Sequence, residues 1–245
     1  TVRQYAEEKL AESGGSPPYE RHARYYASLV ATHGPGVRGA DAARCHRVLE
    51  AEHPNSLAAL LWCARHDDLT DGAALALGMV RDLWRFWEAR GLWREGRLWI
   101  DEALCAQHGS DHDRGHALSS SGVLAYLLGD YDDARRRLAR ALDLLRAAGD
   151  AAGAANALHG LGQVARFQGR YDEAEQRFRE TLEAKRRAGD RMGESVALLS
   201  LALLAIERGD QETARPLLEQ TLAIDREMGD PVGAAVSLVN LGFLA

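Results

Sequence analysis

A six-residue pattern recurs in this chain with a constant spacing of 40 residues, and this repeat restricts the fold more than any other feature. The pattern has Gly first and Ala last, and it begins at Gly129, Gly169 and Gly209. A Gly-Asp pair begins 20 residues after each of these glycines. A period of this length indicates an array of similar units, each of which stacks on its neighbours.

Each unit predicts two helices joined by a short turn. In the unit that covers 151–190, the helices run over about 152–168 and 171–188, with Gly169 between them. Glycine at a helix end suits a left-handed C-terminal residue, and the Asp or Arg that follows it suits the start of the next helix. The second helix carries an apolar stripe of Tyr171, Ala174, Phe178 and Leu182. This i, i+3, i+7, i+11 spacing is typical of an amphipathic helix.

Two residue types inside the helices carry structural predictions. Gly162 lies in the middle of a first helix, with Gly122 and Gly242 at the equivalent positions of other units. Glycine there costs about 1 kcal/mol relative to Ala, so its recurrence predicts a close approach between helices. Pro216 lies inside a second helix, where it removes one backbone hydrogen bond. We expect a kink or a late helix start there.

The repeat resembles the tetratricopeptide repeat. The resemblance rests on the pair Leu161-Gly162 and on the turn from Gly169 to Ala174 with Tyr171 inside it. It implies an all-α fold, a right-handed α-solenoid of helical hairpins. The 40-residue period is longer than the usual 34 residues, and the usual proline near the end of the unit is missing. HEAT-type repeats have a similar period but lack the turn, so they are the second interpretation.

The predicted organisation has two parts. Residues 71–245 form the repeat array, with units over about 71–110, 111–150, 151–190 and 191–230 and a partial unit over 231–245. Residues 1–70 do not repeat and form a helical linker or bundle. Their patterns predict helices over 2–10, 19–30, 42–49 and 55–65, with linkers over 13–18 and 33–40.

The N-terminal segment resembles the part of large bacterial transcriptional regulators of the STAND class, of the LuxR and antibiotic-regulator type, that joins the ATPase to the repeats. The similar strings are TVRQYAEEKL, ERHARYYASLV, LEAEHPNSLAALLWC and LWRFWEARGLWREGRLWIDEAL. The resemblance implies that a nucleotide-binding module, a winged helix and a DNA-binding domain precede Thr1. The apolar stripe of 231–245 lacks a covering helix, so we expect further repeats after it, and self-association or fraying of this segment in the fragment.

Sequence motifs of catalysis are missing. A phosphate-binding loop needs Gly-Lys-Ser/Thr after a Gly-rich stretch, and the two lysines, Lys9 and Lys185, stand outside any such loop. Neither a Gly-x-Ser-x-Gly elbow nor a His-Glu-x-x-His pair is present. We therefore expect a non-catalytic chain without a cofactor.

One cluster has the donor types of a tetrahedral metal site. It comprises Cys105, His108, Asp111, His112, Asp113 and His116. Its spacing matches no established ligand pattern, so a solvated loop is favoured and metal binding stays the alternative. All five tryptophans lie between residues 62 and 99, which favours core packing over a ligand cage.

Charge and cysteine content point to protein partners in the cytoplasm. The formal net charge is −6, from 30 basic and 36 acidic residues, so no overall positive field favours nucleic acid or a membrane. The basic runs at 135–137 and 185–187 lie among acidic residues, which favours a solvated helix face. The three cysteines do not suggest a disulfide framework, and no secretory or membrane-spanning segment is present.

The first helices of such an array line its concave surface, and this surface is the predicted binding groove. Its residues are His116, Ser119, Val123, Tyr126, Asn156, His159, Gln163, Arg166, Phe167, Val196, Leu199, Leu203 and Ile206. His159 and Gln163 stand where some tetratricopeptide proteins have a carboxylate clamp of Lys and Asn. Two functions stay open. The first is an interaction and sensor module of a signalling ATPase or transcriptional regulator, which binds a peptide, a partner domain or a neighbouring segment in the groove. The second is an inducer-binding domain that uses the polar part of the same groove.

Overall fold

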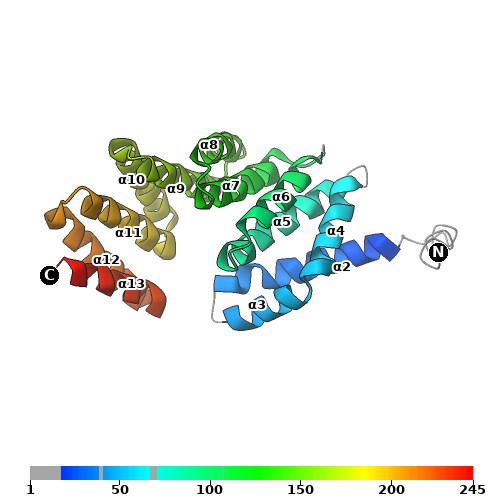
Figure 1. The fold of residues 1–245 in the computed structure, drawn as a ribbon, viewed down its shortest axis with the longest axis horizontal. Helices are drawn as coiled ribbons and strands as arrows, with labels where there is room; N and C mark the ends of the chain where they lie inside the picture. Colours follow the sequence, from blue (N-terminus) through cyan, green and yellow to red (C-terminus); the bar gives the residue numbers. More distant parts are fainter. Residues whose placement is uncertain (1–17, 39–40, 67–70, 107, 245) are drawn as a thin grey trace. The chain divides into compact units, whose positions relative to one another are not determined.

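The computed structural model describes residues 18–38, 41–66, 71–106 and 108–244, and every regular element within these ranges is a helix (Figure 1). The all-α, helical-repeat fold class is confirmed. The helix expected over residues 2–10 lies outside the described residues. No helix in the described ranges is both long enough and apolar enough to cross a membrane.

The chain divides into two compact units, one up to Leu128 and one from Gly129 onward. The helices of the first unit are α2 (Pro18–His33), the short 3-10 helix η1 (Pro35–Arg38), α3 (Ala42–Ala51), α4 (His53–Arg65), α5 (Gly72–Ala89), α6 (Trp93–Leu104) and α7 (Asp111–Leu127). Those of the second are α8 (Tyr131–Ala147), α9 (Ala151–Phe167), α10 (Tyr171–Ala188), α11 (Arg191–Glu207), α12 (Gln211–Met228) and α13 (Pro231–Phe243). The boundary predicted near residue 70 falls inside the first unit, and the division into linker and array stays a prediction.

The first unit has a core built on aromatic side chains. Its helix α5 packs against α2, α4, α6 and α7, and it places Phe86 and Trp87 in the centre, both at most 1% exposed. The other four tryptophans pack against this core as partly buried residues. The packing interpretation of the tryptophan cluster is therefore confirmed.

Gly96 shows how the first unit adapts the repeat to this aromatic core. It stands where the six-residue pattern of the following repeat ends in alanine, at Ala134. A Cβ atom at Gly96 would lie 2.8 Å from Leu124 Cδ1 and 3.0 Å from Trp87 Cε3. The large Trp87 side chain therefore requires the smallest residue opposite it, which explains why the pattern is degenerate here.

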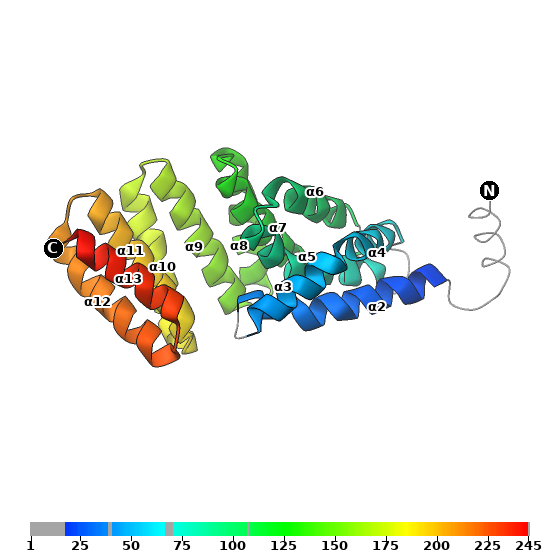
Figure 2. The same ribbon diagram turned by 60° about the horizontal axis from the view of Figure 1, so that its bottom comes forward.

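In the second unit each helix packs against the next one in the chain, and α12 and α13 lie side by side (Figures 1 and 2). Within one residue, α9 and α10 have the predicted bounds. Gly169 between them has φ +72°, and the amide of Arg170 donates to the carbonyl of Ala165 at 2.8 Å. This is the left-handed helix end that only glycine adopts at low cost.

Aspartate begins most helices of the second unit, as predicted. Asp150, Asp190 and Asp210 each accept a hydrogen bond from a backbone amide of the first turn. Arg170 makes no such bond; its guanidinium pairs with Glu173 instead. Helix α10 begins directly after Arg170, as predicted, but without a side-chain cap, because arginine has no acceptor atom.

The two predictions inside the helices have different outcomes. A Cβ atom at Gly162 would lie 2.5 Å from Phe178 Cε1, which confirms the close approach, whereas nothing lies within 4 Å of that position at Gly242. Gly242 is on α13, which no later described helix covers. Helix α12 begins at Gln211 and continues through Pro216. The late start is therefore wrong, and the kink stays a prediction. Pro216 lies beyond the first turn of α12, where it removes one intrahelical hydrogen bond.

Candidate binding surface

The predicted groove residues of α9 are largely engaged with one another and with α11. His159 Nε2 lies 2.9 Å from Ser200 Oγ, and Gln163 Nε2 donates to the same oxygen at 3.2 Å. The Arg166 guanidinium lies 4.9 Å from the Phe167 ring, and Phe167 is 51% exposed. The polar part of the groove is thus an internal hydrogen-bond network with an exposed aromatic ring at its end.

The apolar part of the groove lies on α11 and continues on α13. Val196 is 44% exposed, and Leu199, Leu203 and Ile206 are partly buried. Leu199 and Ile206 pack on a cluster that contains Leu244, just after α13. Helix α13 adds Val236, Val239 and Phe243, which are 39%, 58% and 81% exposed. We call these seven residues of α11 and α13 the apolar row.

The other predicted groove residues lie on α7 in the first unit. His116, Ser119, Val123 and Tyr126 are all partly buried there, and the rings of His112 and His116 meet edge to face at 4.8 Å between centroids. Because α7 and α9 belong to different units, a groove that contains both stays a prediction.

The suggested metal cluster does not assemble within the first unit. Cys105 caps the end of α6 and is exposed, as is His108. Among the described residues of this unit, no three His, Cys, Asp or Glu side chains bring their ligand atoms within 4.8 Å of one another. Asp111, His112, Asp113 and His116 lie on helix α7 and not in a loop, so the solvated-loop interpretation is wrong for these four residues, and metal binding stays a prediction without a test.

Lys185 corrects the interpretation of the second basic run. Sequence reasoning placed 185–187 on a solvated face, but Lys185 is only 8% exposed. Its ammonium donates to Asn156 Oδ1 at 2.8 Å and to Asp190 Oδ2 at 2.9 Å. Burial favours the neutral form of Asp190, but bonds from the Gly193 amide and Lys185 outweigh it and lower the pKa of Asp190. Asn156, predicted to face a ligand, is thus committed to Lys185.

Asp225 is the counterpart of Lys185 in the next 40-residue repeat, and it is also buried, at 2% exposure. The Ser195 hydroxyl donates to one carboxylate oxygen and the Ser237 hydroxyl to the other. The equivalent residue one repeat before Lys185 is Leu145, which is fully buried. The signal in the sequence was therefore a charged residue at a position where another repeat has a buried leucine. A charge that recurs on an apolar stripe could have indicated these buried networks.

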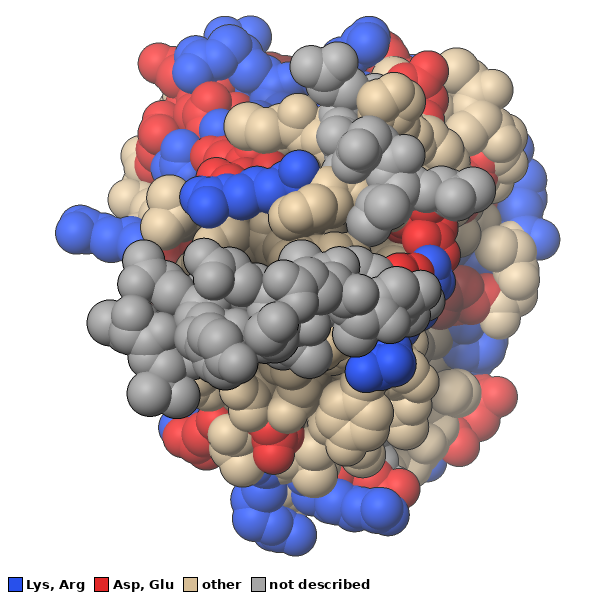
Figure 3. All heavy atoms as spheres, turned by 90° about the vertical axis from the view of Figure 1, so that its right-hand side faces the viewer, with Lys and Arg blue, Asp and Glu red and all other residues tan. Residues whose placement is uncertain are grey.

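Charges of both signs alternate over the face drawn in Figure 3, outside its grey atoms. The basic run at 135–137 follows the same rule, because Arg136 and Arg137 both pair with Asp133, at 3.0 and 2.6 Å. The solvated-face interpretation of this run agrees with these ion pairs.

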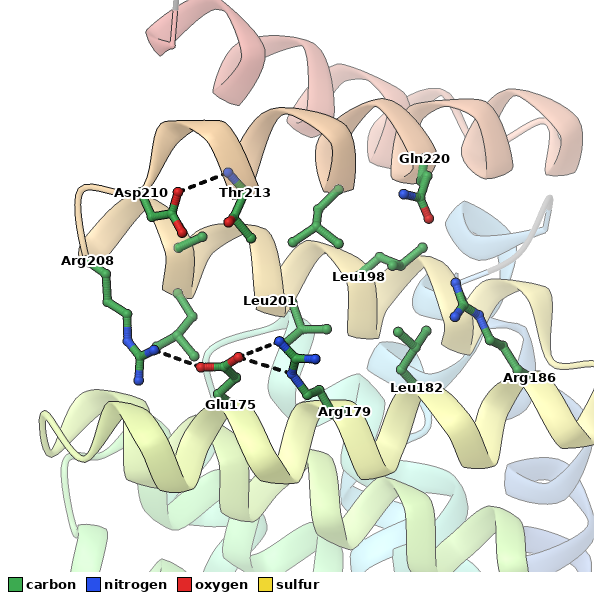
Figure 4. Close-up of a pocket in the computed structure, with 13 residues that line it drawn as sticks. Glu175, Arg179, Leu182, Arg186, Leu198, Leu201, Arg208, Asp210, Thr213 and Gln220 are labelled. Carbon is green, nitrogen blue, oxygen red and sulfur yellow. Dashed lines mark hydrogen bonds and ion pairs between the residues drawn. The ribbon is translucent and has the colours of Figure 1, made fainter.

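A cleft that the sequence did not indicate lies between α10, α11 and α12 (Figure 4). Its volume is about 430 Å³. Its lining residues come from the three helices and from the turn between α11 and α12. Helix α10 contributes Glu175, Arg179, Leu182 and Arg186; α11 contributes Leu198, Leu201, Leu204 and Ala205; the turn contributes Arg208 and Asp210; and α12 contributes Thr213, Leu217 and Gln220. The cleft residues of α11 are offset by two positions from Val196, Leu199 and Leu203, a rotation of roughly 200°. The cleft and the apolar row therefore use opposite faces of α11.

Comparison with known proteins identifies the repeat. The family model of the tetratricopeptide repeat matches residues 113–187 and 153–227. These residues carry tetratricopeptide repeats, and the chain has the helical-repeat fold that such repeats build.

Two curated relatives, one from Mycobacterium bovis and one from Mycobacterium tuberculosis, are 33% identical to this chain over 131 residues. Their names assign them provisionally to the HTH-type transcriptional regulators. The match covers 53% of this chain and 14% of each relative. The chain thus spans about one seventh of the length of these relatives.

Three solved structures share the fold at low identity. BtubC from P. vanneervenii is 18% identical with a TM-score of 0.64, over 77% of this chain and 81% of its own. The apo form of RapI is 12% identical with a TM-score of 0.62, over 92% and 70%. Aspartyl phosphate phosphatase F from Bacillus subtilis is 11% identical with a TM-score of 0.60, over 80% and 59%. Because one of these three proteins is named a phosphatase, the fold alone does not decide whether a chain is catalytic.

Proposed function

We propose that this chain is a non-catalytic interaction module of a cytoplasmic bacterial signalling protein or transcriptional regulator, and that it binds an amphipathic helix of a partner or of a neighbouring segment. The observation that carries the proposal is the exposure of the apolar row. Exposed apolar patches of this kind mark association sites. Helix recognition by repeat proteins uses an apolar groove that takes side chains at i, i+3, i+4 and i+7.

The regulatory context is supported by the names of the mycobacterial relatives and by the resemblance of the N-terminal segment to STAND-class regulators. In such a protein, binding of a partner to the repeats would bias a switch elsewhere in the polypeptide. The predicted groove residues of α9 and α7 would then flank the apolar row. The polar contacts around Ser200 support this role over an inducer site, since His159 and Gln163 already bond to Ser200.

Selection from a library of helical peptides tests this proposal. Binders selected against the whole chain are expected to carry apolar residues at helical spacing. The Val239→Glu and Phe243→Glu variants should bind them at least about tenfold more weakly, because each places a charge in the contact. The control is Glu183→Gln, an exposed change on α10, which should leave binding unchanged. Selected peptides without helical spacing, or with equal affinity for Val239→Glu, would contradict the proposal.

A further inference from the structure

The cleft between α10, α11 and α12 has the composition of a small-molecule site. Its floor is made of leucines from two helices, Leu182, Leu198 and Leu201, each at most 9% exposed. Charged and polar side chains stand at its two ends. Its volume of about 430 Å³ falls within the range of roughly 300–1,000 Å³ that small-molecule sites have.

The preceding repeat has different residues at positions that line this cleft. The equivalent place between α8, α9 and α10 keeps the leucine floor, as Leu142, Leu158 and Leu161. Where the cleft has Leu217, however, that repeat has the longer Arg177, whose Nη1 lies 3.6 Å from Glu180 Oε2. Glu180 is in turn the counterpart of Gln220. In the cleft, Leu217 and Gln220 replace this ion pair, so the lining has neither of these two charges nor the long arginine side chain.

The two ends of the cleft differ in how far their charges are committed (Figure 4). At one end Glu175 accepts from Arg179 at 2.6 Å and from Arg208 at 2.7 Å, while Asp210 accepts from the Thr213 amide. At the other end Arg186 rises from α10 toward Gln220 of α12. Its Nε donates to Glu194 at 2.8 Å. The terminal Nη1 and Nη2 atoms carry no hydrogen bond to any described residue, and the side chain is 49% exposed.

From this arrangement we propose that the cleft binds an amphipathic monocarboxylate with an unbranched aliphatic chain. The chain would lie on the leucine floor between α10 and α12, and the carboxylate would accept both Nη groups of Arg186 and the amide of Gln220. A guanidinium fork matches a carboxylate in a bidentate manner. An unbranched chain is proposed because the leucine floor runs between the two polar ends of the cleft.

This site is separate from the apolar row, on which the interaction proposal rests. Its ligand would contact both α10 and α12, the second helices of neighbouring repeats, without touching the partner surface. Loss of one site would therefore leave the other measurable.

Titration calorimetry of the whole chain with decanoate tests the site, with decyltrimethylammonium and decanol as the matched cation and neutral probes. We expect saturable binding of one decanoate, at least about tenfold tighter than either control. Arg186→Gln should weaken decanoate binding by about tenfold. Leu217→Arg should abolish it, because that variant restores the residue found in the preceding repeat. Arg187→Gln, at an exposed neighbour of Arg186 that does not line the cleft, should have no effect.

The design keeps a readout if Leu217→Arg fails to fold by circular dichroism. Gln220→Glu also copies the preceding repeat, and it should weaken decanoate binding by placing a like charge beside the carboxylate. Absence of saturable decanoate binding, equal binding of decyltrimethylammonium, or unchanged binding by Arg186→Gln and Gln220→Glu would each overturn the proposal.

Discussion

Gly162 marks a close approach between helices in the second unit, and Gly242 offers a matched comparison at the same repeat position. Gly162→Leu forces a side chain into the Phe178 ring, so we expect it to lower the free energy of unfolding by about 1–3 kcal/mol. Gly242→Leu meets open space and should be neutral or stabilising by up to about 1 kcal/mol. Gln163→Ala, which loses partly buried hydrogen bonds to Ser200 and His159, should fall between them. Urea denaturation measures all three; equal midpoints would contradict the packing assignment.

His53 makes the first unit sensitive to acid. Its Nε2 accepts a hydrogen bond from Trp87 Nε1 at 2.9 Å, so the neutral ring is the form that fits. Burial lowers the pKa of His53, although Glu95 opposes this. As the pH falls, the unfolded chain therefore binds this proton before the folded chain does. The stabilisation by the neutral His53 ring is present above the unfolded-state pKa of 6.5, and it is lost as the pH falls through the lower pKa of the folded state.

We accordingly expect the urea midpoint of the first unit, followed by tryptophan fluorescence, to fall between about pH 7 and pH 5. His53→Gln should reduce this dependence, because an amide oxygen accepts the Trp87 bond without titrating. His66→Gln, a change at an exposed histidine, is the control and should keep the dependence. A midpoint that rises on acidification, or an identical fall in His53→Gln, would refute the assignment.

Helix α13 is the element whose apolar surface is least covered. Val232, Val239 and Phe243 are 71%, 58% and 81% exposed, and each such side chain forfeits about 1.5–3 kcal/mol of burial. In the absence of a partner, we expect the chain to self-associate through α13, and Phe243→Glu to shift the sedimentation coefficient toward the monomer. A chain that stays monomeric, with residues 232–244 as protected from hydrogen exchange as 155–165, would show that this surface needs no cover.

For the whole molecule we expect no tight nucleotide binding and no ATP turnover. Lys9 lies outside the described residues, and Lys185 is buried between Asn156 and Asp190. An ammonium held by two oxygens has little capacity left for a phosphate, and neither lysine belongs to a phosphate-binding loop. Calorimetry with MgATP checks this, and an affinity in the micromolar range would overturn it.

The repeat itself determined much of this fold. The 40-residue period predicted the bounds of α9 and α10, the left-handed Gly169 and the close approach at Gly162, because these features depend on local hydrogen bonds and on contacts between adjacent helices. In a repeat array such contacts are nearly all the contacts there are. The candidate apolar row followed from the same periodicity, since helical spacing states which residues share a face.

The tertiary structure alone decided how individual long side chains are used. Lys185 and Arg186 are neighbours in one basic run, yet one is buried against Asn156 and the other stands at the end of an open cleft. The cleft has Leu217 where the preceding repeat has Arg177, and its volume depends on the distance between α10 and α12. Sequence spacing states the face of a helix on which a residue lies, but the free space above that face depends on the position of a second helix.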